Sequence, residues 1–272
     1  MDYSKILILL IITAFYLPIF QALFDTWMVD PYYSHGFIVP LVSGYIIWKK
    51  RKHLKQTDRD FTMGAALLAA GLAVYGYGIM NKSLFVSASS FLIVLAGYVL
   101  SFYGRKNLQR LLFPIAFLIF MIPTPYEDYA STYLQSITAS SSAALLRVFG
   151  IPVVNNGSQL SLGTDTIFVI GDPCSGLRTM LALFALAAVF AYIVEGSAWK
   201  KWVIFLFALP IALVANILRV VLILSIAYYY GEELAMSVFH DFSSILLFLV
   251  AFVLLIVISR WLGCKEVRNM SQ

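Results

Sequence analysis

A cysteine among turn residues is the feature of this chain with the clearest capacity for chemistry. Cys174 lies in the run Gly-Asp-Pro-Cys-Ser-Gly-Leu-Arg, residues 171–178, where a polar segment meets a long apolar one. Pro173 and Gly176 are typical of a loop that leads into a helix. A thiol at a helix N-terminus is close to free N–H groups and to the positive end of the helix dipole, which favour the nucleophilic thiolate. Arg178 follows four residues later, so it shares a helix face with Cys174 and adds positive charge.

Two polar residues interrupt a later apolar segment. Asn216 and Arg219 are three residues apart and therefore share one helix face. A helix that runs outward from Lys201 places Arg219 about 27 Å along its axis, near the outer edge of a hydrocarbon core about 30 Å thick. A charge at that depth usually faces the protein interior or a water pocket. Snorkelling of Arg219 to the lipid headgroups is the alternative, but it does not explain the neighbouring Asn216.

A third candidate, His240, precedes the last apolar segment at the same expected depth. The alternative explanation of His240 and Asp241 is a helix N-terminus that Asp241 caps. A nucleophile, a base and a cation together are what acyl transfer requires. Cys174 would attack a peptide carbonyl, and His240 would take the thiol proton and later protonate the leaving amine. Arg219 would stabilise the oxyanion, with Arg178 as a second candidate for that role or for binding a substrate carboxylate.

A second polar run, Tyr33-Ser34-His35-Gly36, precedes another apolar segment. His35 is a rival base, but a structural or substrate-contacting role fits this run better, and an interfacial aromatic belt is the alternative. The histidines and Cys174 lack the spacing of metal ligands, so we expect neither a metal nor another cofactor.

The composition defines the class of protein. The chain has 272 residues, of which 61% are hydrophobic and 12% charged. Several apolar runs are long enough to cross a bilayer, which predicts an all-α polytopic membrane protein forming a single domain over residues 1–272. We expect about eight spans, at 5–24, 34–48, 61–80, 84–103, 111–125, 177–195, 201–226 and 242–262.

The distribution of charge predicts the orientation. Most of the 19 Lys and Arg residues fall in one set of loops, at Lys5 and within 49–59, 105–110, 200–201 and 260–268. The positive-inside rule makes these loops and both termini cytoplasmic. The net charge of +5 then reflects the basic loops that orient the chain in the membrane, and no nucleic-acid partner is needed to explain it. Cys174 is extracytoplasmic and Cys264 cytoplasmic, so the two thiols lie too far apart for a disulfide.

The longest extracytoplasmic segment covers about 126–176. Its first part, 126–149, is rich in Ser and Ala and predicts a helix, either on the membrane surface or within the bundle. Residues 151–162 predict a β-hairpin that turns at Asn156-Gly157, and 166–170 would add a third strand. This small β element leads the chain directly into Cys174.

Together these motifs resemble the exosortase/archaeosortase family of membrane-embedded cysteine transpeptidases. The resemblance rests on Tyr-Ser-His-Gly at 33–36, Pro-Cys-Ser-Gly-Leu-Arg at 173–178, Asn-x-x-Arg at 216–219 and His240. It implies Cys174 as nucleophile, Arg219 as essential cation and His240 as the third member. The histidine at 240, where archaeosortases tend to carry arginine, points to the bacterial exosortase branch and so to the inner membrane.

The resemblance also implies the partners. Substrates would be membrane-anchored proteins with a C-terminal sorting signal of the PEP-CTERM kind: a short motif such as Pro-Glu-Pro, a membrane helix and a basic tail. Such a signal places its motif at the outer face, at the expected depth of Cys174. The enzyme would form a thioester and transfer the protein to an unknown acceptor, such as a lipid or an envelope glycan. Arg178, Asn216, Tyr33, Ser34 and His35 are the residues we expect to contact the substrate.

Two other functions stay open at the level of sequence. The first is a membrane cysteine protease that uses the same three residues with water as the acceptor. The second is a non-enzymatic transporter or envelope-assembly subunit, because charged residues within a bundle often line a transport path. The sequence contains neither a pair of broken helices nor an inverted repeat in support of transport.

Overall fold

The structure is a computed structural model that describes residues 3–54, 60–162, 166–169, 176–235, 240–264 and 266; for 166–169, 240–245 and 247 it describes the backbone alone. The helices group into two compact units, one within residues 1–125 (unit 1) and the other within residues 126–268 (unit 2). Cys174 lies outside the described residues. The organisation of the chain as a single membrane domain stays a prediction.

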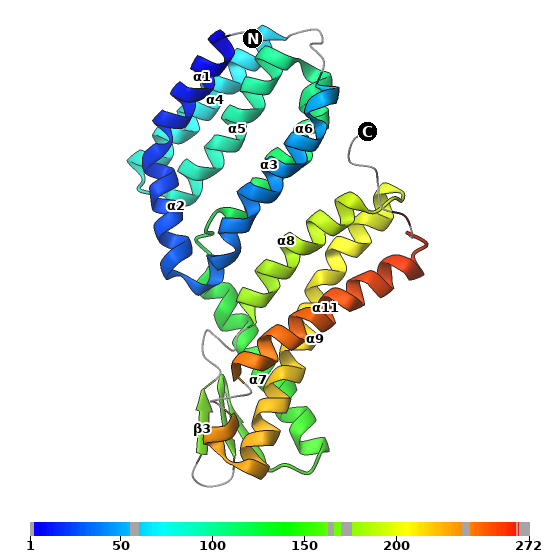
Figure 1. Ribbon diagram of the computed structural model, residues 1–272. Helices are drawn as coiled ribbons and strands as arrows, with labels where there is room; N and C mark the ends of the chain where they lie inside the picture. The colour runs from blue at the N-terminus through cyan, green and yellow to red at the C-terminus, as the bar shows by residue number, and fades with distance from the viewer. Residues whose placement is uncertain are drawn as a thin grey trace. The chain divides into compact units, whose positions relative to one another are not determined.

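Unit 1 is a helical bundle (Figure 1). Its elements are α1 (Tyr3–Phe15), α2 (Leu17–Val29), the 3-10 helix η1 (Pro31–Phe37), α3 (Ile38–Lys50), η2 (Arg51–His53), α4 (Phe61–Met80), α5 (Leu84–Tyr103), α6 (Arg105–Phe117) and η3 (Leu118–Met121). The first predicted span is bent by 55° between α1 and α2. Pro18 explains the break, because its ring cannot follow a continuous helical turn. Tyr16 at the break is fully buried, and its hydroxyl lies 2.6 Å from Ser90 Oγ on α5.

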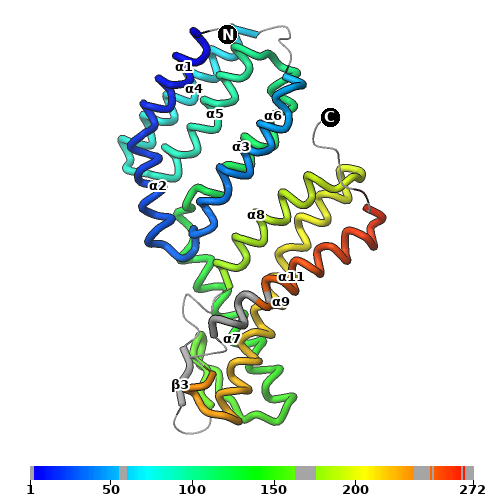
Figure 2. Tube along the Cα trace, in the orientation of Figure 1, coloured from blue at the N-terminus to red at the C-terminus, as the bar shows by residue number. Residues whose placement is uncertain are grey.

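The helices α4 and α5 lie side by side and run in opposite directions (Figure 2), and glycines line the contact between them. Gly64, Gly71 and Gly78 recur every seven residues and are the buried positions of α4. A Cβ at Gly71 would lie 2.6 Å from Val94 Cγ2 and 3.0 Å from the backbone nitrogen of Val94. Lipid tails provide no hydrophobic force between membrane helices, so close backbone approach of this kind is what stabilises such a pair.

A proline within α6 determines how α3 packs against it. Pro114 has no N–H and leaves the carbonyl of Arg110 without its helical donor. Lys50 Nζ, on a buried side chain, donates to that carbonyl oxygen at 2.9 Å. Ser43 Oγ donates to the carbonyl of Pro114 at 2.7 Å. These two bonds fix α3 to α6, and with it the 3-10 helix η1 that precedes α3.

Unit 2 combines helices with a small antiparallel sheet. Its elements are α7 (Glu127–Val148), β1 (Val153–Asn156), β2 (Gln159–Leu162), β3 (Thr166–Val169), α8 (Leu177–Ile193), α9 (Ala198–Tyr230), α10 (Glu232–Leu234) and α11 (His240–Trp261). The strand order is β1-β2-β3, and both pairs are antiparallel. The predicted helix, hairpin and third strand are confirmed, with one change of register. Asn156 pairs with Gln159, so the loop is Gly157-Ser158, with Gly157 at a φ of +71°.

Two cores hold unit 2 together. In the first, α7, β1, β2 and the C-terminal part of α9 bury a cluster of apolar side chains: Ala139, Ala143, Leu146, Ile151, Val153, Leu160, Leu162, Val220, Val221 and Leu224. In the second, α8, α9 and α11 pack around Leu183, Ile204 and Leu255, with Cys264 buried at its edge. The 33 residues of α9 extend over about 50 Å, so this one helix contributes to both cores.

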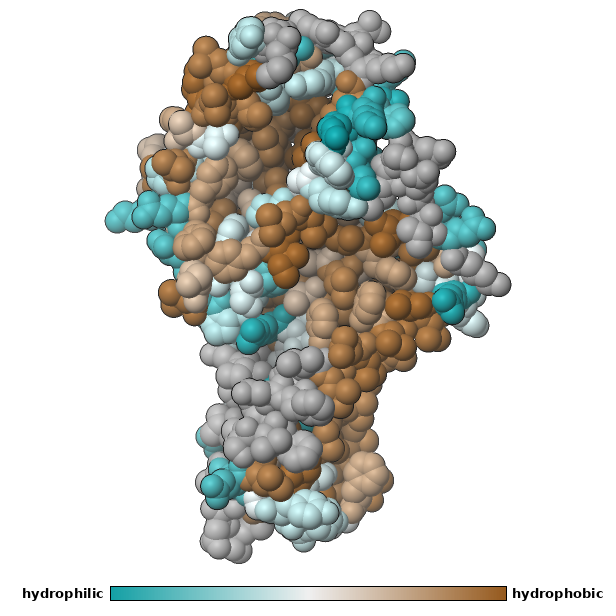
Figure 3. Space-filling model, in the orientation of Figure 1, coloured by the Kyte–Doolittle hydropathy of each residue, from teal (hydrophilic) through white to brown (hydrophobic). Residues whose placement is uncertain are grey.

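The apolar helices identify a multi-pass membrane protein, but eight spans are not confirmed. Every predicted span overlaps a helix. Among the residues that the structure describes, three helices (α4, α5 and α9) are long and apolar enough to cross a bilayer alone, and the bent pair of α1 and α2 adds a fourth span if it counts as one. The helices α3 and α6 have only 13 residues each, because η1 and η3 take up the rest of their predicted spans. Hydrophobic surface covers α1, α2, α9 and α11 in the view of Figure 3.

Leucine at Gly71 should destabilise unit 1 by about 1–3 kcal/mol, because the added side chain overpacks the contact with Val94. Gly76 is the matched control on the same helix, since a Cβ there meets nothing within 4 Å. Thermal denaturation in detergent, followed by size-exclusion chromatography, measures both variants. Equal melting temperatures for Gly71→Leu and Gly76→Leu would show that the glycine contact between α4 and α5 does not stabilise the unit.

Candidate active site

The first residue described after Cys174 is Gly176, at the start of α8. It has φ +81° and ψ −2°, a left-handed conformation that favours glycine. Its carbonyl accepts the first helical hydrogen bond, from Met180 N at 2.9 Å. A Cβ at this position would lie 2.6 Å from Asn216 Cγ and 2.7 Å from Asn216 Nδ2. The helix that follows the candidate nucleophile therefore begins in direct contact with the Asn216 amide.

Asn216 is fixed by α7. Its side chain is 5% exposed, and Nδ2 donates to Thr138 Oγ1 at 3.2 Å. Thr138 is fully buried, as is Ser142 one turn later on the same face. Ser142 Oγ donates to the carbonyl of Ile217 at 3.4 Å. The Ser- and Ala-rich helix thus packs on α9 through polar side chains. Of the two places predicted for it, this favours the one within the bundle over the one on the membrane surface.

Arg219 is on the same face of α9. Its side chain is 5% exposed, and the buried stripe around it contains Ala212, Ala215, Asn216, Val220 and Ile223. Leu218 and Leu222 are exposed on the opposite face. Burial at helical spacing places Arg219 on the protein side of α9, as predicted for a functional charge, and not on a side open to lipid headgroups.

The remaining catalytic candidates are only partly described. The helix α11 begins at His240, as expected, and it packs on α8 and α9; the His240 side chain lies outside the described part of the chain, as does Cys174. The structure therefore joins the start of α8 to Asn216 and Thr138. It describes no catalytic triad, and the roles of Cys174, Arg219 and His240 stay predictions.

Arg178 is exposed in the first turn of α8. A cation at a helix N-terminus opposes the helix dipole and costs about 0.3–1 kcal/mol when exposed. Helix stability therefore does not account for its position. This is consistent with a role towards an anion or a carbonyl, which stays a prediction.

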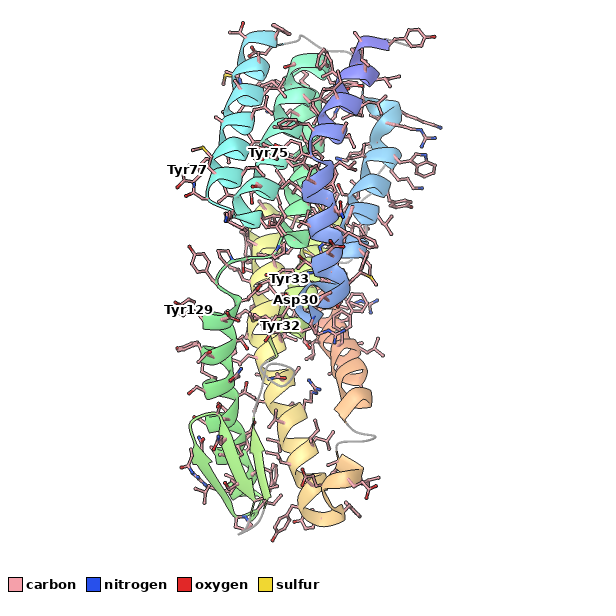
Figure 4. All side chains as sticks on the ribbon, turned by 90° about the vertical axis from the view of Figure 1, so that its left-hand side faces the viewer. Asp30, Tyr32, Tyr33, Tyr75, Tyr77 and Tyr129 are labelled. Carbon is pink, nitrogen blue, oxygen red and sulfur yellow. The ribbon has the colours of Figure 1, made fainter. Side chains whose placement is uncertain are left out.

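The Tyr-Ser-His-Gly run belongs to unit 1. The Asp30 side chain accepts from Tyr32 N at 2.8 Å and begins η1, and Figure 4 shows Asp30, Tyr32 and Tyr33 together at this turn. The Tyr33 hydroxyl accepts from Thr124 N at 2.8 Å, and Ser34 Oγ donates to the carbonyl of Pro31 at 3.2 Å.

His35 is bound to the same unit. Its Nε2 lies 3.1 Å from the carbonyl oxygen of Phe120, and since a carbonyl only accepts, Nε2 carries the proton. Gly36 is buried against Trp27, whose Nε1 donates to the carbonyl of Met121 at 2.8 Å. These bonds hold η1, which contains the run, against η3 and so give the run a structural role. Contact of Tyr33, Ser34 and His35 with substrate stays a prediction.

Thr138 is the site residue that sequence reasoning missed. The available signal was the spacing of Thr138 and Ser142, which repeats small polar residues at one helical turn among alanines. Spacing alone does not reveal that this face packs against Asn216. Among the described residues, no group of three His, Cys, Asp or Glu side chains is placed to hold a metal ion.

The helical units and the polar contact at the start of α8 define a class: an integral membrane protein with buried polar residues beside a segment that carries a cysteine. The chain belongs to the transmembrane exosortase family, whose model matches residues 27–257. The match contains the runs at 33–36, 173–178 and 216–219 as well as His240. No curated protein and no solved structure matches the chain.

Alanine at Gly176 should destabilise unit 2 more than alanine at Gly157. Both glycines have a positive φ, so both substitutions carry a similar backbone cost of about 1–2 kcal/mol. The added Cβ collides with Asn216 at position 176 but meets open space at 157. Thermal melting of the purified variants should give the larger loss for Gly176→Ala, and Asn216→Ala combined with it should recover part of that loss. Equal losses for the two glycines would contradict the close contact.

Proposed function

We propose that this protein is a membrane-embedded cysteine transpeptidase that cleaves C-terminal sorting signals at the extracytoplasmic face of the inner membrane. The single observation that carries the proposal is the contact between Gly176 and Asn216. Gly176 follows Cys174 by two residues in the sequence and begins the next helix. Membership of the transmembrane exosortase family supports the same reaction class.

The proposed reaction follows from the chemistry of the three candidates. Cys174 gives its proton to His240, and the sulfur attacks the scissile carbonyl carbon of the substrate. Negative charge develops on the carbonyl oxygen and is stabilised by Arg219. The C–N bond then breaks, His240 protonates the leaving amine, and the substrate remains bound as a thioester. An acceptor nucleophile attacks that thioester, loses its proton to His240 and releases the thiol.

The described geometry supports this assignment of Arg219. A charged residue within a membrane helix usually faces the protein interior, as the buried Arg219 does. It lies one helical turn beyond Asn216, on the face of α9 that contacts the start of α8. Low-dielectric surroundings strengthen its interaction with a developing oxyanion.

The substrate follows from the topology that we propose. With the basic loops inside, the start of α8 and residues 216–219 lie towards the outer face. A membrane-anchored protein with a basic cytoplasmic tail would present the motif before its own helix at that depth. Arg178, exposed in the first turn of α8, is our candidate for contact with a carboxylate or a carbonyl of that motif.

Substitution of Cys174 by alanine should abolish processing of a co-expressed substrate that carries the motif, a membrane helix and a basic tail. Immunoblotting follows the size and membrane retention of the substrate at equal abundance of the enzyme. Cys264→Ala is the matched control and should process normally, since Cys264 is buried at the edge of the α8, α9 and α11 core. Processing that persists in Cys174→Ala would exclude Cys174 as the nucleophile and favour the transport or assembly function. Mass spectrometry of the product then separates transfer from hydrolysis, because hydrolysis leaves a free C-terminal carboxylate.

Glutamine at Arg219 should slow processing by about 100-fold or more, the usual loss when an oxyanion-stabilising group is removed. Arg260→Gln is the matched control, because Arg260 is exposed in the last turn of α11. Rates are compared in a time course of substrate conversion, normalised to the amount of enzyme in the membrane. A normal rate for Arg219→Gln would exclude Arg219 from the catalytic group.

A further inference from the structure

Thr138 lies at the base of a short chain of contacts that ends beside the candidate nucleophile. Its hydroxyl accepts from Asn216 Nδ2 at 3.2 Å, and the Asn216 amide lies against Gly176. Gly176 is two residues from Cys174. Thr138 itself is fully buried on α7, which comes before the β-sheet in the chain. Through Asn216, Thr138 is thus linked to the start of α8.

The hydroxyl of Thr138 links the Asn216 amide to α7. Asn216 Nδ2 donates to Thr138 Oγ1 at 3.2 Å, and both side chains are buried. A buried amide that loses its acceptor also carries a desolvation cost, which favours rearrangement of its surroundings. Gly176 contacts this amide and is the first residue that would respond.

We propose that Thr138 is a positioning residue for the cysteine transpeptidase reaction, acting on Cys174 through Asn216 and Gly176. The inference rests on the proposed function, in which Cys174 is the nucleophile. The hydrogen bond to Thr138 holds the Asn216 amide in place, and the amide packs against Gly176 at the start of α8. Gly176 is two residues from Cys174, so a shift at the start of α8 would change the reactivity of the thiol.

The test compares Thr138→Val with Thr138→Ser. Valine has the shape of threonine without the hydroxyl, and serine keeps the hydroxyl. Ser142→Ala is the matched control, because Ser142 is equally buried one turn away and bonds to a backbone carbonyl of α9. We expect processing to fall about tenfold in Thr138→Val, with near wild-type rates in Thr138→Ser and Ser142→Ala. If the Thr138→Val protein does not accumulate, Thr138→Ala tests the same role, because alanine also lacks the hydroxyl and is smaller than threonine.

A second readout separates positioning from a loss of stability. In a Cys264→Ala background Cys174 is the single thiol of the chain, and its alkylation by iodoacetamide is followed against pH. Loss of the Thr138 hydroxyl should raise the pH midpoint of alkylation, because a thiol that is no longer held near positive charge ionises less readily. A lower protein yield with an unchanged midpoint would mean that Thr138 only stabilises the fold, and would overturn the proposal.

Coupling to Asn216 completes the test. If Thr138 acts through Asn216, then Thr138→Val should have little further effect in an Asn216→Ala background. Full additivity of the two losses would overturn the proposal. Failure of the proposed function would look different: Cys174→Ala would then process substrate normally, whatever residue 138 is. Loss of processing in Cys174→Ala with normal rates in both Thr138→Val and Thr138→Ala would reject the role of Thr138 alone.

Discussion

The arrangement of unit 2 depends on one buried amide. Asn216 is on a helix whose other face exposes leucine, and its own side chain is buried. An amide in such a place must find partners within the protein or carry a penalty of about 1–3 kcal/mol. Thr138 provides an acceptor from α7, and the absence of a Cβ at Gly176 gives the amide its place beside α8. Three helices thus meet at a single side chain.

The same requirement explains other features of the chain. Where Pro114 leaves a carbonyl of α6 without a donor, the buried Lys50 ammonium supplies one from α3. Where α4 and α5 pack, glycines at a spacing of seven residues let the two backbones approach closely, with Ser101 opposite Gly64 and Ser87 opposite Gly78. In a membrane protein, backbone polar groups need partners inside the protein. Small residues let helices pack closely where no hydrophobic effect drives them together. In unit 1 the first device joins α3 to α6, and the second joins α4 to α5.

Sequence patterns predicted the elements better than their ends and contacts. Apolar runs located each predicted span on a helix, and alternation with Asn-Gly located the hairpin. The loop lies one residue later than expected, because pairing of Asn156 with Gln159 leaves Gly157 and Ser158 as its two residues. Hydropathy also did not reveal η1 and η3, which shorten α3 and α6. The burial of Arg219 followed from its cost in a membrane, whereas Thr138 depends on a contact 78 residues away in the chain, which no local pattern encodes.

The path of the chain shows how the contact at Gly176 ties α8 to the rest of unit 2. From Thr138 the chain completes α7, passes through β1, β2 and β3, and enters α8 at Gly176. β3 pairs with β2, and α7 lies in the same apolar core as the sheet. The hydrogen bond from Asn216 to Thr138 joins α9 to α7, and Gly176 packs on the same amide. Because Thr138 precedes α8 in the chain and Asn216 follows it, the start of α8 is held from both directions of the chain, which a contact within one helix could not achieve.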